Sequence, residues 1–127
     1  MPPIRLSPRE KQLMEILWQQ SEASIRELHA ALPARKRPAY TTIQTLIYRL
    51  EDKRAVRRIR KVGNFHIFAP SITREETDRG LLDDLLALFN GQSRPVIAHL
   101  IESGKLTRED IAYAEDTLRA FEEEGQF

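Results

Sequence analysis

Four short segments of this chain carry the residues that begin an α-helix, and they make its fold mainly helical. Each places a hydroxyl side chain three residues before an acid. The hydroxyl accepts the backbone N–H of the third helical residue, while the acid accepts that of the cap. The segments are Ser7-Pro8-Arg9-Glu10, Ser24-Ile25-Arg26-Glu27, Thr73-Arg74-Glu75-Glu76 and Thr107-Arg108-Glu109-Asp110. We expect the last to be the weakest, because Asp is shorter than Glu.

Apolar residues at helical spacing extend these four starts into helices and indicate two more, so that six are predicted. The first three are predicted over 7–20, 24–32 and 40–53, with Pro33 ending the second. In the second helix, Ile25, Leu28 and Ala31 are expected to face inward. The other helices are predicted over 73–89, 94–103 and 107–124.

Between the third and fourth helices, the hydrophobic period changes to that of strands. Residues 55–61 and 65–69 are rich in β-branched and aromatic residues, and a Gly63-Asn64 pair lies between them. Such a pair makes a tight turn and predicts a β-hairpin, which Pro70 closes. Its register stays open, because Val56, Ile59 and Val62 do not share one face. The predicted fold is mainly α with a small β-hairpin: a winged helix-turn-helix over 1–71 and a helical dimerisation domain over 72–127.

The charge of the chain changes sign between its two halves. Residues 1–70 carry 14 Lys and Arg against 6 Asp and Glu, whereas residues 71–127 carry 6 against 13. Ten of the 14 cations fall between Arg35 and Lys61, around the third helix and the hairpin. A basic cluster of this kind is typical of a surface that binds nucleic acid.

The third helix shows which side chains would meet that partner. At 100° per residue, Ile43, Leu46, Ile47 and Leu50 form one apolar stripe. The opposite face carries groups that read base edges and phosphates: Thr41, Thr45 and Tyr48, flanked by Gln44 and Arg49. An ordinary solvated face would more usually carry Glu and Lys. We therefore predict a recognition helix.

Two further groups extend the predicted DNA surface. Thr41 and Thr42 lie at the start of the third helix, where backbone amides and the helix dipole favour a phosphate. The alternative is that Thr41 is only the helix cap. In the hairpin, Arg57, Arg58, Arg60 and Lys61 would lie along the DNA backbone or enter the minor groove. Their alternative role is a charged strand edge that resists aggregation.

Two stretches of the chain resemble a known family. They are Leu6-Ser7-Pro8-Arg9-Glu10 through Met14-Glu15-Ile16-Leu17-Trp18, and Tyr40-Thr41-Thr42-Ile43-Gln44-Thr45-Leu46-Ile47-Tyr48-Arg49-Leu50-Glu51-Asp52-Lys53. Both are similar to the penicillinase and methicillin-resistance repressors of the BlaI/MecI type. The resemblance continues to Phe68-Ala69-Pro70 and, more weakly, through the acidic half.

The resemblance implies a homodimeric winged-helix repressor on a double-stranded DNA operator with dyad symmetry. It implies DNA contacts at the third-helix and hairpin residues named above, and a dimer interface made by the C-terminal helices. It also implies release through cleavage by a membrane-bound sensor metallopeptidase. The bond cleaved in staphylococcal members, Asn-Phe, aligns here with His99-Leu100.

The chain departs from the family pattern at two other places. Arg54 stands where the family usually has a glycine with left-handed backbone, so this turn must differ or carry strain. His66 occupies an aromatic position of the hairpin. The chain has no cysteine, so the metal site of the copper-responsive branch is not expected.

The acidic half has more apolar surface than short helices bury by themselves. The expected dimer contacts are Leu82, Leu85, Leu86, Phe89, Ile97, Leu100, Ile101, Ile111, Leu118 and Phe121. We expect a second copy of the chain to cover them.

Other classes of function find little support. There is no phosphate loop, nucleophile motif or histidine pair at ligand spacing, so we expect no enzyme, cofactor or metal. No apolar run is long enough to span a membrane, and Met1-Pro2-Pro3-Ile4-Arg5 has no secretory signal, so a cytoplasmic protein is expected. RNA is a poorer partner, since no aromatic stacking platform is evident. The competing hypothesis is a winged-helix adaptor that binds proteins without sequence-specific DNA binding.

Overall fold

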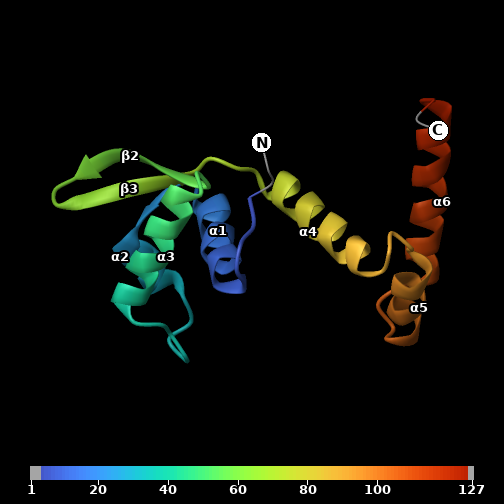
Figure 1. Ribbon diagram of the computed structural model, residues 1–127, viewed down its shortest axis with the longest axis horizontal. Coiled ribbons are helices and arrows are strands. Elements are labelled where there is room, and N and C mark those ends of the chain that lie inside the picture. The colour runs from blue at the N-terminus through green and yellow to red at the C-terminus, as the bar shows by residue number, and fades with distance from the viewer. Residues whose placement is uncertain (1–3, 126–127) are drawn as a thin grey trace. The chain divides into compact units, whose positions relative to one another are not determined.

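A computed structural model of the chain describes residues 4–125. The expectations placed on residues 1–3 and 126–127 (the missing secretory signal and the outer ends of the two domains) lie outside that range. The elements follow in the order α1 Pro8–Gln20, β1 Ala23–Ser24, α2 Ile25–Ala31, α3 Tyr40–Asp52, β2 Val56–Val62, β3 Phe65–Pro70, α4 Arg74–Leu88, α5 Arg94–Glu102 and α6 Arg108–Glu123 (Figure 1). The chain forms two compact units that divide between Leu81 and Leu82.

The helices begin where the capping residues predict. At Ser7, Ser24 and Thr107 the hydroxyl accepts the backbone N–H three residues on, and the acid at that position accepts the cap N–H. The box at Thr107 therefore forms in full, although Asp replaces Glu. At Thr73 the hydroxyl accepts the backbone N–H of Glu76 at 3.1 Å.

The first unit, called here the winged module, has a core made by all three of its helices and its sheet. The fully buried large side chains are Leu13, Met14, Leu17, Leu28, Ile43, Ile47, Leu50 and Phe68. Leu46 is also buried, which confirms the apolar stripe predicted for α3. The prediction that Ala31 faces inward is wrong: α2 ends there, and the extended backbone of Leu32 turns that side chain into the core instead.

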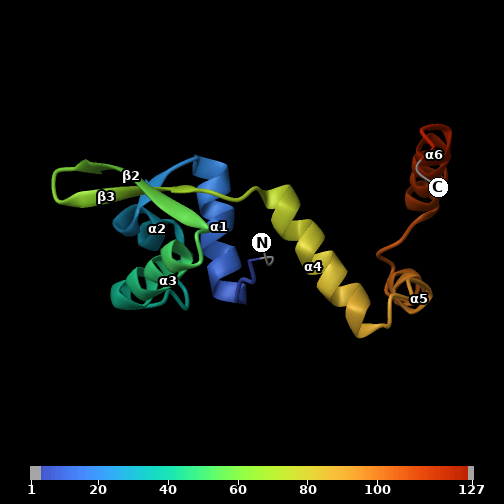
Figure 2. The ribbon, with the colours of Figure 1, turned by 45° about the horizontal axis from the view of Figure 1, so that its top comes forward.

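The sheet of the module has three antiparallel strands in the order β1-β3-β2. Figure 2 shows β2 and β3 side by side. The predicted hairpin is present as β2 and β3. The first strand, β1, was not predicted; it pairs Ala23 with Phe68 and Ser24 with Ile67. A bulge between Arg58 and Arg60 leaves Ile59 without a partner across the hairpin. This extra residue shifts the alternation of side chains along β2, which is why Val56, Ile59 and Val62 do not share one face.

The start of α4 is fastened to α1 within the module. The indole Nε1–H of Trp18 donates to the carbonyl of Ile72 at 2.8 Å. Arg74 pairs with Glu15 at 2.8 Å and Lys11 pairs with Asp78 at 3.0 Å. The hydrogen bond from Lys11, and then that from Arg74, hold the pKa of Glu15 below its usual value. The module therefore extends beyond its last strand into the first turns of α4.

The second unit has no buried side chain between Leu82 and Gly125. Many of its large apolar side chains are exposed, from Leu85 at 41% to Leu88 at 80%. A folded unit of this size normally buries a core of its own. Its apolar helix faces therefore remain available for another surface.

Candidate nucleic-acid interface

The outer face of α3 carries the side chains that the sequence analysis expected there. Thr41, Thr42, Thr45, Tyr48 and Arg49 are exposed and Gln44 is half-buried, opposite the buried stripe. Two hydrogen bonds order this face: the Gln44 amide donates to the Tyr48 hydroxyl at 3.1 Å, and the Thr45 hydroxyl to the Thr41 carbonyl at 3.0 Å. The face is neutral except for Arg49, and its donors and acceptors suit base edges.

The start of α3 lacks a side-chain cap. The N-cap residue is Ala39, which has no side-chain acceptor, so Thr41 is not the cap. The Ala39 carbonyl takes the backbone N–H groups of Thr42 and Ile43. Earlier amides of the helix receive no such help, and the helix dipole adds positive potential there. A helix start of this kind can bind an anion such as a phosphate.

Two of the four hairpin cations are held by acids from elsewhere in the module. Arg58 donates two hydrogen bonds to Glu51, at 2.7 and 3.1 Å, and its guanidinium lies over the rings of Tyr48 and Phe68. Arg60 donates to both carboxylate oxygens of Glu22. The hydrogen bond from Arg60 lowers the pKa of the Glu22 carboxyl below its usual value. Glu22 and Glu51 were not predicted as partners of these cations.

The other two hairpin cations are arranged differently. Arg57 donates to the backbone carbonyl of Pro70 at 2.7 Å, which leaves its charge unbalanced by an acid. Lys61 is exposed and pairs across the hairpin with His66. Neither residue forms an ion pair with any residue of the described range 4–125. These two charges are therefore the unneutralised part of the hairpin.

A hollow of about 100 Å³ lies between α3 and the hairpin. Tyr40, Gln44 and Tyr48 line it from the helix, and Arg58, Asn64 and His66 line it from the strands and the turn. Tyr40, Asn64 and His66 were not among the predicted site residues. Phe65, in the same wall, lies under the guanidinium of Arg26. Polar side chains of α3 and of the hairpin therefore face the same hollow.

The backbone of the turn between α3 and β2 determines how the hairpin follows the end of α3. Arg54 has φ +64°, the left-handed conformation that was expected to favour glycine at this turn. The N–H of Arg54 bonds the Glu51 carbonyl at 3.0 Å, and that of Ala55 bonds the Leu50 carbonyl at 2.9 Å. This is the Schellman ending of a helix. The turn keeps the expected geometry and carries the strain of a side chain at positive φ.

Among residues 4–125, no group of three or more His, Asp or Glu side chains gathers in a way that would hold a metal ion. No helix in this range combines the length and the apolar character that crossing a membrane requires.

Comparisons with known proteins agree with this geometry. The sequence profile of the penicillinase repressor family matches residues 6–120. The transcriptional regulator BlaI of Mycobacterium tuberculosis, matched in two strains, is 37% identical over 101 residues, which cover 77% of this chain and 72% of that protein. The solution structure of the DNA-binding domain of the repressor BlaI matches with a TM-score of 0.52 and 26% identity, over 58% of this chain and 89% of that domain.

Proposed function

This chain belongs to the penicillinase repressor family, and from that premise we propose that it is a transcriptional repressor that binds a dyad DNA operator as a homodimer. The family consists of repressors and not of enzymes. One observation supports the DNA-binding role most strongly: the outer face of α3 joins hydroxyl, amide and phenol groups to a helix start that has no side-chain cap. A protein-binding adaptor would instead need an apolar patch on this face.

In this proposal the groups on α3 and the cations beside them have different tasks. Gln44, Thr45 and Tyr48 contact base edges, and Thr41 and Thr42 bring the helix start to a phosphate. Arg57 and Lys61 bind the backbone directly. Arg58 and Arg60 bind the DNA backbone only when each guanidinium leaves its carboxylate partner and pairs with a phosphate instead. Arg49, at the edge of the face, adds charge where the helix meets the groove.

The test is selection of bound duplexes from a random pool by the purified chain. We expect an enriched sequence with dyad symmetry, because two copies present two recognition helices about one DNA turn apart. The log of the affinity for it should fall linearly with the log of the salt concentration. The Arg49→Ala variant should lose tight binding while its circular dichroism spectrum stays unchanged. An affinity that does not change with salt concentration, or an enriched sequence without dyad symmetry, would favour the protein-binding adaptor.

The homodimer is proposed from the second unit. Several apolar side chains are at least 41% exposed: Leu82 and Leu85 of α4, Phe89 just after it, Ile97 and Ile101 of α5, and Ile111, Leu118 and Phe121 of α6. Leu86 and Leu100 are half-buried. Apolar surface on this scale, on three short helices that bury no core, is stabilised when a second copy covers it. The acidic charge of this half keeps it away from the duplex.

Sedimentation tests the dimer, and a shortened chain tests its purpose. The full chain should sediment as a dimer at micromolar concentration; a monomer would overturn the proposal. A chain that stops after Leu81 keeps Trp18–Ile72 and the ion pairs of α4 with α1, so it retains the whole module. We expect it to be a folded monomer with much weaker operator binding. A chain that stops after Pro70 would also lose these contacts. Weaker DNA binding could then come either from a damaged module or from the lost dimer.

We also propose that repression is relieved by proteolysis near His99-Leu100. The His99-Leu100 bond lies inside α5, and His99 is exposed. No side chain of α5 is buried, so packing does not oppose local unfolding of this helix. A cut there would detach α6 and its apolar seam from the rest of the dimer surface. Mass spectrometry of the chain from cells treated with a β-lactam should find a fragment that ends at His99. An intact chain in derepressed cells would refute this step.

A further inference from the structure

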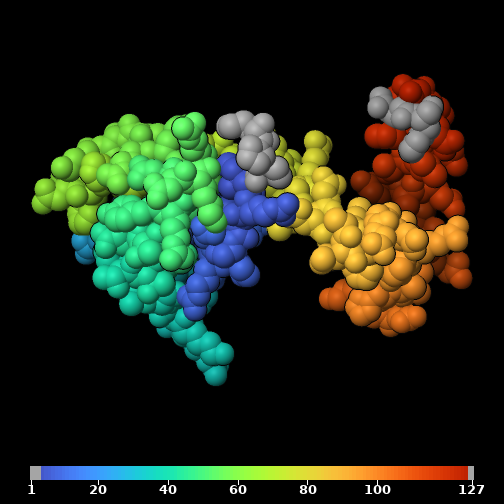
Figure 3. All heavy atoms as spheres, in the orientation of Figure 1, coloured from blue at the N-terminus to red at the C-terminus, as the bar shows by residue number. Residues whose placement is uncertain are grey.

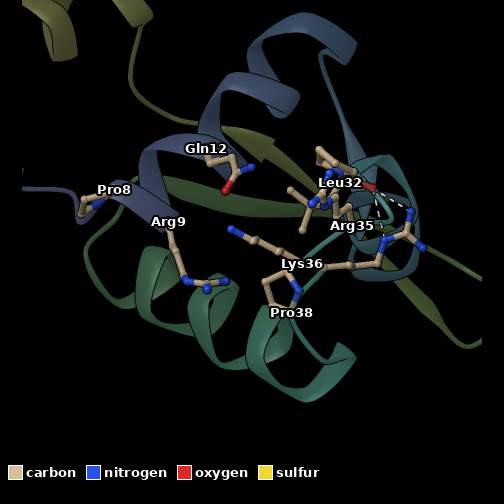
Figure 4. Close-up of a pocket in the computed structure, with 9 residues that line it drawn as sticks. Pro8, Arg9, Gln12, Leu32, Arg35, Lys36 and Pro38 are labelled. Atoms are coloured by element: carbon tan, nitrogen blue, oxygen red, sulfur yellow. Dashed lines mark hydrogen bonds between the residues drawn. The ribbon is translucent and has the colours of Figure 1, made fainter.

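A second hollow lies on the other side of the α3 start, between α1 and the α2–α3 connection. It has a volume of about 330 Å³, and nine residues line it (Figure 4). Four of them are cations, Arg9 from α1 and Arg35, Lys36 and Arg37 from the connection, and none is an acid. The connection itself projects from the surface of the module (Figure 3). The recognition helix and the hairpin do not use this hollow.

The connection is held in place by its own hydrogen bonds. Arg37 donates to the Leu32 carbonyl at 2.7 and 3.2 Å and to the Ala30 carbonyl at 3.2 Å. The His29 ring bonds the Pro38 carbonyl at 3.0 Å. Lys36 has φ +62°, a conformation that costs energy for any residue with a side chain. Strain of this kind persists where surrounding bonds fix the backbone, and it often marks a functional position.

The Lys36 side chain that this backbone presents extends toward α1. Figure 4 shows its amine between the Gln12 amide and the Arg9 guanidinium. Within residues 4–125, Arg9, Arg35 and Lys36 form no ion pair, in contrast to Arg58 and Arg60 of the hairpin. Cations that converge without an acid repel one another unless an anion joins them. The site therefore lacks a negative partner.

The position of the hollow indicates the chemistry of that partner. Pro38, one of its lining residues, is followed by Ala39 and the uncapped start of α3. The proposed duplex would lie against that start, so a backbone phosphate outside the reading face would come near the hollow. Guanidinium and ammonium groups together bind phosphate well, the first through paired hydrogen bonds and the second as a point charge.

We propose that this hollow is a phosphate-binding site, made by Arg9, Arg35 and Lys36 with Gln12 as a neutral donor. Its phosphate source is either the DNA backbone, in which case the site rests on the proposed function and adds a contact to it, or a free phosphorylated molecule. At Lys36, a loss of phosphate binding can be separated from a loss of the structure of the turn. Replacing it by asparagine, which tolerates positive φ, removes the charge and keeps the turn.

The DNA arm of the test compares the wild-type chain with the Arg9→Gln/Lys36→Asn variant on the selected duplex. We expect affinity about three- to tenfold weaker and a plot of log affinity against log salt whose slope falls by about 0.9, the value for one lost phosphate contact. The matched control is Arg94→Gln/Arg108→Gln, which removes two charges from the second unit and should leave affinity and slope unchanged. Melting temperatures check that both variants fold.

The second arm titrates inorganic phosphate into the free protein and follows backbone amide NMR signals of residues 33–38. Saturable shifts in the wild type that vanish in the Arg9→Gln/Lys36→Asn variant, with an unchanged DNA slope, assign the site to a free phosphate. A changed slope assigns it to the duplex. If the wild type binds no duplex, the proposed function fails, and the phosphate titration alone decides the site. The inference is overturned if neither measurement changes.

Discussion

The ammonium of Lys53 lies 2.7 Å from Oε1 of Glu10, joining the end of α3 to the start of α1. The Glu10 side chain is only 3% exposed, and the same carboxylate accepts the backbone N–H of Ser7 at 2.8 Å. Its second oxygen, Oε2, has no hydrogen-bond partner. Burial raises the pKa of Glu10, but the bonds from Lys53 and Ser7 outweigh burial, so the pKa lies below its usual 4.5.

This pair makes the stability of the module depend on pH. Because the pKa is lower in the folded state, the stabilisation is complete above about pH 4.5 and is lost as the pH falls through the folded-state value. Urea midpoints across this range should drop on acidification. The Glu10→Gln variant keeps an acceptor for Lys53 and Ser7, so it should lose about 1 kcal/mol at neutral pH and show a flatter pH profile. An unchanged profile would mean that Glu10 does not carry the effect.

The strained turn after α3 predicts a stabilising substitution. Arg54→Gly removes the cost of a side chain at φ +64°, partly offset by the greater freedom of glycine in the unfolded chain. We expect unfolding to require about 0.5–1 kcal/mol more free energy, measured by urea denaturation. Arg54→Ala removes the same charge but keeps a Cβ, so it should bring no such gain. Equal gains in both variants would assign the effect to charge.

Arg60 donates two hydrogen bonds to Glu22, so in the proposed complex this carboxylate would compete with DNA for Arg60. The Glu22→Gln variant removes that competition and one negative charge near the duplex, so we expect about two- to threefold tighter binding and a steeper salt slope. Glu75→Gln, on an exposed turn of α4, removes the same charge elsewhere and serves as the control. A slope that does not change for Glu22→Gln would show that Arg60 does not reach a phosphate.

The hydrogen bond from Trp18 to the Ile72 carbonyl joins α1 to the segment just before α4. Trp18→Phe keeps an aromatic ring but removes the Nε1–H donor, which should lower the free energy of unfolding by about 0.5–1.5 kcal/mol. Hydrogen exchange should speed up in the first turns of α4 and stay slow in α3. Affinity for the full operator should fall more than affinity for one half-site, because only the former depends on how two modules are joined.

Sequence reasoning succeeded where neighbouring residues decide the structure. Helix starts at Ser7, Ser24 and Thr107 follow from pairs three residues apart, and the buried stripe of α3 follows from its period. It failed where residues far apart meet. Glu22 lies 38 positions before Arg60, and the two-residue β1 exists only because β3 offers it an edge. The bulge at Ile59 belongs to the pairing of two strands, so one strand alone could not reveal it.

The lack of any buried side chain between Leu82 and Gly125 has a consequence for the concentration of this protein that repression requires. If the second unit gains its order only from its partner, chains at low abundance are mostly single and bind half-sites weakly. Operator occupancy then rises with the square of the chain concentration while dimers are scarce. Repression by such a protein would begin abruptly as it accumulates and end abruptly as it is diluted by growth.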